Sequence, residues 1–348
     1  MNETPGQLYI INEQDVRTGD CSRNYKIGIV RDAENRDSKD RLLEHQTGNP
    51  RRLYVVETLK TPAVEHIETT LHHLFASNRV LGEWLELNET QLQAVIAKAR
   101  ELKEEMEANL SDFRKAEELK NVISSGSKSI PTHESQYWHD ELLTFREVIK
   151  ICNEALGKYD GYLYIAIEKG VVAPGVAKIQ QRTAPKKFDQ KLFESKYPDL
   201  FEKYSDMKTQ VKGQFRITTP KDWASDISAL SSKQVELMSE FMDMLECADH
   251  SLDTGFALHE KHLAVLETLQ YAEWREEMAN VKLRVLTDNS DGIEGICSWK
   301  RESENSRVLD KKSLQEDHPS EYNDCVIEGK ATQALIVNPK MAGVSNDN

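Results

Sequence analysis

The sequence predicts an α+β protein: a small three-stranded antiparallel sheet flanked by helices, then a long helix, then a mixed α+β region. Two short runs, Leu8–Ile11 and Tyr25–Val30, are rich in the β-branched and aromatic residues that favour strands. The stretch from Asn88 to Ile123 has no glycine or proline, and its apolar residues recur at helical spacing. Charged residues make up 30% of the chain and apolar residues 39%, which suits packed cores covered by solvated helix faces.

The length of 348 residues predicts two or three domains of ordinary size. The run Ser124–Thr132 is rich in serine and also contains glycine and proline, so we expect a flexible linker there. The predicted divisions are a sheet domain at 1–88, a helix and linker at 89–132, an α+β module at 133–222, a connecting helix at 223–252, and a second module with a tail at 253–348.

Charge and cysteine content restrict the function classes. The formal charge is −14, and residues 1–88 contribute −3 of it, from 11 basic and 14 acidic residues. A general nucleic-acid coat protein is usually basic, so any contact with nucleic acid should be local. Five scattered cysteines without a Cys-x-x-Cys pair argue against a disulfide scaffold or a zinc ribbon. With no signal peptide and no long apolar run, we expect a cytoplasmic protein without membrane contact.

Further elements of the predicted sheet domain place its polar residues. Leu53–Leu59 is expected to be a third strand, and Ala63–Ala76 has the apolar stripe of a helix. Because side chains alternate along a strand, Lys26 lies on the face opposite Tyr25 and its apolar neighbours. Glu68 and His72 are four residues apart, so they lie together on one side of the predicted helix.

Several separated motifs give this domain a family resemblance. In chain order they are the strand containing Tyr9, the run Tyr25-Lys26-Ile27-Gly28, the helix start Asp40-Arg41-Leu42-Leu43, the helix Glu68–Phe75 and the closing Gly82-Glu83-Trp84-Leu85. Together they resemble the GIY-YIG nuclease superfamily. The most similar branch has a Lys-Ile-Gly second motif and a closing Gly-Glu-Trp, as in phage and bacterial proteins resembling a T5 phage open reading frame product. The resemblance covers the first quarter of the chain.

The resemblance implies a site for phosphodiester hydrolysis. It implies that Tyr9 is the general base and that Lys26 lowers the pKa of Tyr9 by favouring the phenolate. It also implies that Arg41 binds the scissile phosphate, with Arg36 as the competing match because the polar stretch before Arg41 is longer than the family's. From the residues alone, a half-buried strand tyrosine is the simpler interpretation of Tyr9, and Arg41 could equally be a solvated helix arginine paired with Asp37 or Glu44.

A single-carboxylate metal site is also implied. Glu68 matches the family's metal-binding glutamate, with Glu65 as the fallback, and the expected ion is Mg²⁺ or Mn²⁺ with most of its waters retained. His72 contacts Glu68 or a phosphate oxygen, or is structural. Arg51 and Arg52 add local positive charge and are candidate DNA contacts, although such a pair is more often only solvated.

The long helix and the modules after it allow several interpretations. The helix carries about three heptads, which is short for a coiled coil. It could form a coiled-coil seam between two copies, but a helix that braces its own chain is the favoured interpretation. The modules suggest an internal duplication in which each copy contains a helix, two strands, short helices begun by a proline, and another strand. The matched segments are Tyr162–Ile167 with Val281–Leu286 (both expected to be strands), Arg182 with Arg301, Phe188–Phe193 with Leu309–Leu314, and Tyr197-Pro198 with His318-Pro319.

No second active site is predicted. Asp291, Glu294 and Lys300 resemble another nuclease pattern, but Ser298 stands where the second carboxylate is needed, so we interpret both modules as structural. His259 and His262 lack metal-ligand partners and are expected at the surface. A helix between the modules is expected to begin near Thr219–Asp222, where the sequence resembles a capping box.

These observations predict a metal-dependent DNA endonuclease whose C-terminal region binds target DNA or a protein partner, or self-associates, with a phage- or defence-related role. The alternative is a non-catalytic interaction protein that keeps the fold as a scaffold, and the acidic C-terminal region favours it. A basic groove beside Glu68 would support the nuclease, and an acidic one the alternative.

Overall fold

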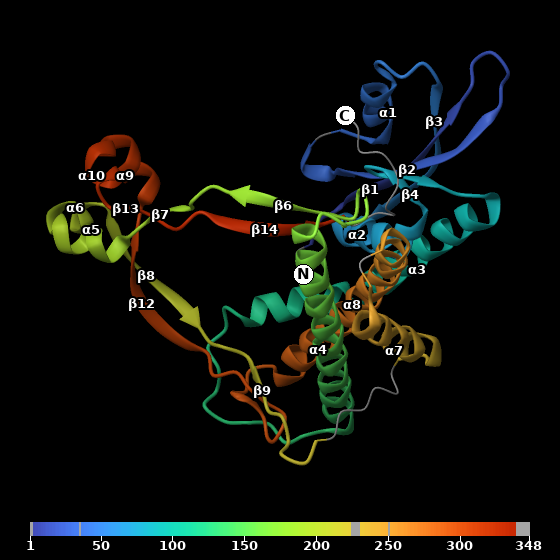
Figure 1. The fold of residues 1–348 in the computed structure, drawn as a ribbon. Coiled ribbons are helices and arrows are strands. Elements are labelled where there is room, and N and C mark those ends of the chain that lie inside the picture. The colour runs from blue at the N-terminus through green and yellow to red at the C-terminus, as the bar shows by residue number, and fades with distance from the viewer. Residues whose placement is uncertain (1–2, 35, 224–229, 250, 339–348) are drawn as a thin grey trace.

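The computed structural model describes residues 3–34, 36–223, 230–249 and 251–338, and its α+β architecture confirms the predicted fold class. Figure 1 shows an N-terminal sheet domain, a body of long helices next to it, and a small lobe that stands away from both. The tail expected at the end of the second module lies outside the described residues from 339 onward.

The N-terminal domain is built on an antiparallel sheet with the strand order β3-β1-β2-β5-β4. Its elements are β1 (Gly6–Gln14), β2 (Cys21–Arg31), η1 (Asp32–Glu34), α1 (Ser38–Gln46), β3 (Arg52–Thr61), α2 (Val64–Leu74), η2 (Ala76–Asn78), β4 (Arg79–Leu81) and β5 (Trp84–Glu86). The three predicted strands form its main part, and the short β4 and β5 extend it to five. One face, with Leu8 and Ile27, packs on α2 and α3, and the opposite face, with Tyr9 and Ile11, packs on α1.

Four long helices form the body: α3 (Glu89–Leu119), α4 (His133–Glu168), α7 (Ser232–Cys247) and α8 (Leu252–Thr287). Asn88 and Gln91 form a capping box that starts α3. The apolar stripe of α3 packs first on the sheet domain, through residues such as Val95, and then on Trp274 of α8, through Phe113. The chain therefore covers this stripe itself, so α3 is a bracing helix and the predicted coiled-coil seam is unsupported.

The segment between α3 and α4 differs from the flexible linker expected at Ser124–Thr132. The backbone N–H groups of Ser125 and Ser129 donate to the carbonyls of Asn289 and Gly292, at 2.7 and 2.9 Å. These bonds attach the segment to the loop after α8, because serine-rich backbone that lies against another chain segment can satisfy its polar groups there.

Arg301 anchors the same junction. Its side chain is fully buried, and its guanidinium donates to the carbonyls of Leu119 at 2.8 Å, Asp288 at 2.5 Å and Ser290 at 3.3 Å. Its charge also lies 4.3 Å from the centroid of the Trp299 ring. Arg301 therefore joins the end of α3 to the end of α8.

The two modules exchange strands with each other. The first contains β6 (Ala177–Arg182), β7 (Lys186–Phe188), α5 (Gln190–Lys196), α6 (Pro198–Lys203), β8 (Ser205–Lys212) and β9 (Arg216–Ile217). The second contains β10 (Gly292–Ile293), β11 (Cys297–Ser298), β12 (Glu302–Leu309), α9 (Lys311–Asp317), α10 (Pro319–Asn323), β13 (Val326–Glu328) and β14 (Thr332–Val337). Antiparallel pairs join β6 to β14, β7 to β13, β8 to β12 and β9 to β11. Each of these four pairs thus takes one strand from each module.

Local geometry supports the internal duplication. Asp189 accepts hydrogen bonds from the N–H groups two and three residues further on, and so caps α5; Asp310 caps α9 in the same way. Pro198 and Pro319 occupy the first positions of α6 and α10, as the sequence predicted.

Three expectations about these modules are wrong. Tyr162–Ile167 and Val281–Leu286 are not strands but the last turns of α4 and α8, because their buried residues continue the apolar stripes by which these helices pack. The helix between the modules does not begin near Thr219–Asp222. It begins at Ser232, where Ser231 and Gln234 form the capping box.

The third error concerns two histidines of α8. His259 and His262 were expected at the surface, but they are only 1% and 6% exposed. The His259 Nδ1 atom lies 3.4 Å from the Tyr159 hydroxyl of α4, and the two imidazole rings are stacked. α8 packs on α3, α4 and α7 together, so most of its circumference is covered.

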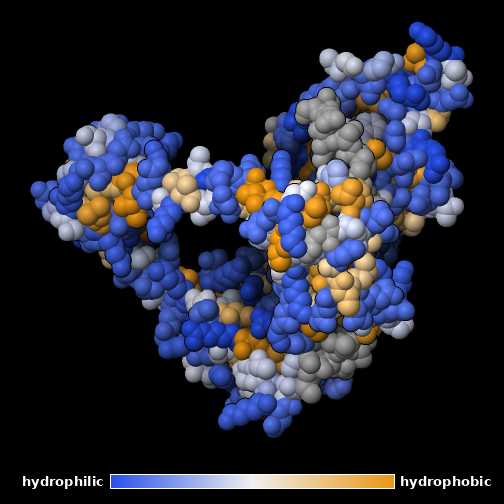
Figure 2. All heavy atoms as spheres, viewed as in Figure 1, coloured by the Kyte–Doolittle hydropathy of each residue, from blue (hydrophilic) through white to orange (hydrophobic). Residues whose placement is uncertain are grey.

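Two arms connect the body to the distal lobe, which consists of α5, α6, α9 and α10 packed around buried residues such as Phe193. The β6–β14 arm comprises residues 177–188 and 326–337, and the β8–β12 arm comprises residues 205–212 and 302–309. Figure 2 shows an opening bounded by the two arms, the lobe and the body. Both arms therefore present exposed side chains at a distance from the helical core.

All five cysteines are free, so the structure contains no disulfide among them. Within the described ranges, no helix combines the length and the apolar character needed to cross a bilayer.

Candidate active site

Tyr9 lies across the backbone of Gly28 on the α1 face of the sheet. The β1–β2 register places the two residues opposite each other. A Cβ atom at position 28 would lie 2.5 Å from the Tyr9 hydroxyl, so this packing requires glycine. Tyr9 is 2% exposed, and its burial, together with the charge of Glu83, raises its pKa to about 12. The phenol is therefore protonated at neutral pH.

The Tyr9 hydroxyl contacts His45, which α1 positions. The distance from Tyr9 Oη to His45 Nε2 is 3.3 Å. Burial, with the charges of Lys26 and Arg41, lowers the pKa of His45, so its ring is neutral at pH 7. With its proton on Nδ1, the ring can accept the Tyr9 proton at Nε2.

Lys26 forms an ion pair with Glu83 instead of acting on Tyr9. Its side chain is 7% exposed, and its Nζ atom donates to the Glu83 carboxylate. The N–H group of Ile27 also donates to the Glu83 carbonyl at 3.1 Å, which ties β2 to the loop before β5. Burial opposes ionisation of Glu83, but the hydrogen bond and charge of Lys26 outweigh it, and the pKa of Glu83 is lowered. The pKa of Tyr9 is raised by burial, in the opposite direction to the lowering expected from Lys26.

Glu68 lies half-buried in α2 within electrostatic reach of this pair. Burial and the Glu83 charge raise its pKa to about 7, against the opposing charges of Lys26 and Arg31. Its two oxygen atoms are ligands that Mg²⁺ prefers. No three His, Cys, Asp or Glu side chains converge as a metal cluster within the described residues. A metal at this position would accordingly depend on Glu68, with water as most of its remaining ligands. The fallback, Glu65, is instead paired with Arg31 at 2.5 Å.

Two arginines near α1 share the same pair of glutamates. Arg41 Nη1 lies 3.0 Å from Glu44 Oε2, and Arg36 Nη1 lies 2.7 Å from Glu44 Oε1. Glu34 also pairs with both. The charge of Arg41 acts against burial on the pKa of Tyr9, which places Arg41 in the site. These four charges balance, so neither arginine is an unneutralised cation.

His72 is 8% exposed, and burial lowers its pKa to about 4, so the ring is neutral. No hydrogen bond joins it to Glu68 within the described part of the chain. This environment suits the structural interpretation of His72.

Arg51 and Arg52 lie away from the site, near the β1–β2 turn. Arg52 is opposite Gln14, five residues from Tyr9 along β1, which corresponds to roughly 17 Å. Arg51 is paired with Glu13 at 3.4 Å. As DNA contacts they would touch a duplex well away from Tyr9.

The structure places three further residues at the site that the sequence patterns had not indicated. His45 follows Arg41 by four positions, and that helical spacing was a usable signal. Glu83 belongs to the closing Gly-Glu-Trp motif, but only the fold brings it to Lys26. Arg79 is half-buried, and burial lowers its pKa against the charges of Glu83 and Glu68. Nothing in the local sequence pattern predicts this position for Arg79.

The domain that contains this site is similar to one known family. Residues 6–100 match the family model of the T5orf172 domain. T5orf172 is a GIY-YIG-like domain associated with endonucleases and nuclease-like DNA binding. The matched range includes the start of α3, whose first turns complete the core of the domain. No curated protein and no solved structure matched this chain.

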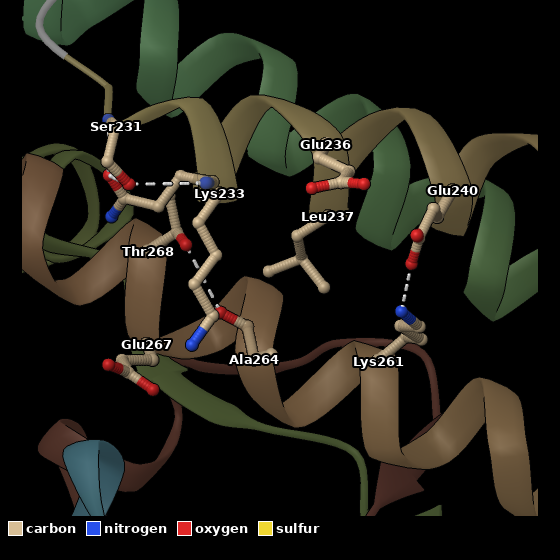
Figure 3. A pocket seen from close by; sticks show the side chains of 10 residues that line it. Ser231, Lys233, Glu236, Leu237, Glu240, Lys261, Ala264, Glu267 and Thr268 are labelled. Atoms are coloured by element: carbon tan, nitrogen blue, oxygen red, sulfur yellow. Dashed lines mark hydrogen bonds and ion pairs between the residues drawn. The ribbon is translucent and has the colours of Figure 1, made fainter.

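A separate hollow of about 580 Å³ lies between α7 and α8 (Figure 3). Several of its polar groups have structural partners: Lys261 is paired with Glu240, and the Thr268 hydroxyl donates to the Ala264 carbonyl at 3.2 Å. Lys233 extends toward Glu267. This hollow resembles the solvated junction of two helices more than a reaction site.

Proposed function

We propose that the protein is a metal-dependent endonuclease that hydrolyses DNA phosphodiester bonds in its T5orf172 domain. One observation supports this most strongly: the charges of Glu83, Arg41 and Glu68 all act on the pKa of Tyr9. Residues from two helices and from the turn before β5 therefore converge at the phenol of one β1 residue. Groups with strongly perturbed pKa values gather in this way at functional sites.

In this proposal, Tyr9 and His45 move the proton. With a pKa of about 12, the Tyr9 phenol is not a free phenolate at neutral pH. It passes its own proton to the neutral His45 ring, 3.3 Å away, as it takes one from the attacking water. Proton transfer from Tyr9 to His45 takes the place of the lowered Tyr9 pKa expected from Lys26, because Lys26 forms an ion pair with Glu83.

Arg41 and Glu68 act on the phosphate side. Arg41 exchanges its contact with Glu44 for the scissile phosphate, whose geometry suits the guanidinium fork. Mg²⁺ or Mn²⁺ bound at Glu68 supplies charge stabilisation for the pentacovalent phosphate. Glu68 must lose its proton to serve as a ligand, so activity should rise with pH through about 7.

Nicking of supercoiled plasmid by the full chain tests this function. Wild-type protein should convert supercoiled into open-circular DNA with Mg²⁺ and not with EDTA, and Glu68→Ala should abolish the conversion. Glu65→Ala is the matched control, because it removes a carboxylate one turn earlier that is paired with Arg31. Wild-type protein that nicks no DNA with Mg²⁺ or Mn²⁺, or equal activity of wild type and Glu68→Ala, would contradict the proposal.

A non-catalytic role remains the second candidate, and the charge balance around α1 favours it. Glu34 and Glu44 neutralise Arg36 and Arg41, so these two arginines add no net positive charge beside Glu68. The plasmid assay separates the two functions, since a scaffold binds its partner without cleaving DNA.

A further inference from the structure

We propose that the β6–β14 arm is the surface that holds duplex DNA, and this inference rests on the proposed nuclease function. Residues 1–88, which contain the candidate site, have a net charge of −3, and Arg36 and Arg41 beside the site are paired with glutamates. Phosphate neutralisation supplies most non-specific affinity for DNA. An enzyme with this domain therefore needs cations elsewhere in the chain.

The two arms differ in charge although their topology is the same. The β6–β14 arm, residues 177–188 and 326–337, contains five lysines and arginines and one acidic residue, Glu328. The β8–β12 arm, residues 205–212 and 302–309, contains three basic and three acidic residues. The fold does not require this contrast, because both arms pair one strand from each module.

The cations of the two arms also differ in their partners. In the β8–β12 arm, Lys212 is paired with Glu304 at 3.2 Å, and Arg307 approaches Glu202 at 3.8 Å. In the β6–β14 arm, Lys178 and Arg182 are exposed, and neither forms an ion pair with any residue that the structure describes. The charge of the β6–β14 arm is therefore available to a polyanion.

The geometry of this arm fits a duplex groove. Lys178, Gln180 and Arg182 alternate with other residues along β6, so their side chains share one face. Four residues of strand separate Lys178 from Arg182 by roughly 13 Å, close to the major-groove width of about 12 Å. A two-stranded ribbon fits that groove, and arginine, lysine and glutamine are the side chains that read guanine and adenine there.

The opposite face of the β6–β14 arm attaches the arm to the body. Leu335 and Val337 of β14 pack against the core of α4, α7 and α8. They alternate with Ile336, which is opposite Lys178, so they point to the side away from Lys178. One face thus attaches the arm and the other is exposed for a ligand, while Figure 2 shows the arm standing clear of the body.

Fluorescence anisotropy with a labelled random-sequence 30-base-pair duplex tests the inference. The protein is the full chain with Glu68→Ala, which prevents cleavage, titrated between about 50 and 200 mM KCl. Adding Lys178→Ala and Arg182→Ala should weaken binding about tenfold or more at the lowest salt. It should also reduce the slope of log K against log salt by about 1.8, since each phosphate contact contributes about 0.9.

Two controls make the test specific to the arm. Lys208→Ala with Lys212→Ala removes the same charge from the β8–β12 arm and should leave the slope unchanged. Gln180→Ala alters the β6–β14 arm without removing charge and should also leave the slope unchanged. Thermal unfolding of each variant should match the parent, because the substituted side chains are exposed.

Equal weakening by the two double variants would overturn the inference, as would no weakening by Lys178→Ala with Arg182→Ala. If the parent protein binds no duplex at 50 mM salt, the inference is also overturned. That result would indicate that an acidic protein surface, and not DNA, binds the β6–β14 arm. Plasmid nicking by wild-type protein separates this from the proposed function. DNA binding that depends on the β6–β14 arm, without nicking, would contradict the nuclease function and support the inference. Nicking together with equal DNA binding by the two double variants would support the nuclease function and contradict the inference.

Discussion

The Lys26 ammonium is paired with the Glu83 carboxylate, and both charges act on Glu68. Because Glu83 and burial together raise the pKa of Glu68 to about 7, this carboxyl carries its proton in the folded protein over a range in which it is ionised when unfolded. Lys26 therefore lies beside an ionised carboxylate, Glu83, and near a second one, Glu68, that titrates near neutral pH.

The raised pKa of Glu68 predicts a loss of stability at higher pH. The contribution of the raised Glu68 pKa to the free energy of unfolding is fully present below about pH 4.5 and is lost as pH rises through about 7. Glu68 is partly exposed, so we expect a loss of about 1–2 kcal/mol, less than the full shift would give. Urea unfolding of metal-free protein at pH 5.5 and 8.0 measures it. Glu68→Gln should be more stable than wild type at pH 8.0 by about this amount and similar at pH 5.5; an identical pH dependence in both proteins would refute the assignment.

Tyr9→Phe removes the hydroxyl that we propose carries the proton, while keeping the ring that packs on Gly28. We expect the nicking rate to fall by about 10²–10⁴-fold, with DNA affinity in the anisotropy assay unchanged. His45→Ala should lower the rate less, because water can accept the proton in its place. A parallel loss of affinity in Tyr9→Phe would instead make the hydroxyl a structural or binding group.

Gly28→Ala places a Cβ atom 2.5 Å from the Tyr9 hydroxyl. The ring must move, so we expect a loss of about 1–3 kcal/mol in unfolding free energy together with loss of nicking. Gly161→Ala is the control: this exposed residue of α4 has nothing within 4 Å of a new Cβ, and alanine there should stabilise the helix by about 0.5–1 kcal/mol. If Gly28→Ala is as stable and active as wild type, Tyr9 does not occupy this position.

Arg301→Ala should destabilise the protein by about 2–5 kcal/mol, because it leaves the carbonyls of Leu119, Asp288 and Ser290 buried without their donor. The equivalent residue of the first module, Arg182, is exposed, so Arg182→Ala should change stability by no more than about 0.5 kcal/mol. Chemical unfolding compares the two variants. Limited proteolysis should show faster cleavage within 124–132 in Arg301→Ala only, and similar stability of both variants would remove the anchoring role of Arg301.

Local patterns predicted the elements whose residues make local contacts. The alternation around Tyr9 and Lys26, the helix that follows Asn88 and the Pro198 and Pro319 helix starts all depend on neighbours within a few positions. The strand predicted at Tyr162–Ile167 was wrong because β-branched and aromatic residues also suit a buried helix that packs on another. Only the contact between α4 and α8 determines that this segment is helical.

Features that depend on distant segments could not be predicted. His45 contacts Tyr9 only because α1 packs on the sheet face, and Glu83 reaches Lys26 only through the β2–β5 pair. Arg182 and Arg301 are equivalent in sequence, yet one is exposed and the other is buried by the end of α3. The duplication was visible, but the exchange of strands between its copies was not.

That exchange constrains how the chain is made. Arg182 pairs with Thr332, so the two strands of one arm are 150 positions apart. At synthesis rates of about 5–20 residues per second, β6 waits roughly 8–30 s on the ribosome for its partner. During that time its unpaired edge can join a strand of another nascent chain. Two chains made side by side on one message could trade β14 segments, and expression yield should then fall as translation becomes denser.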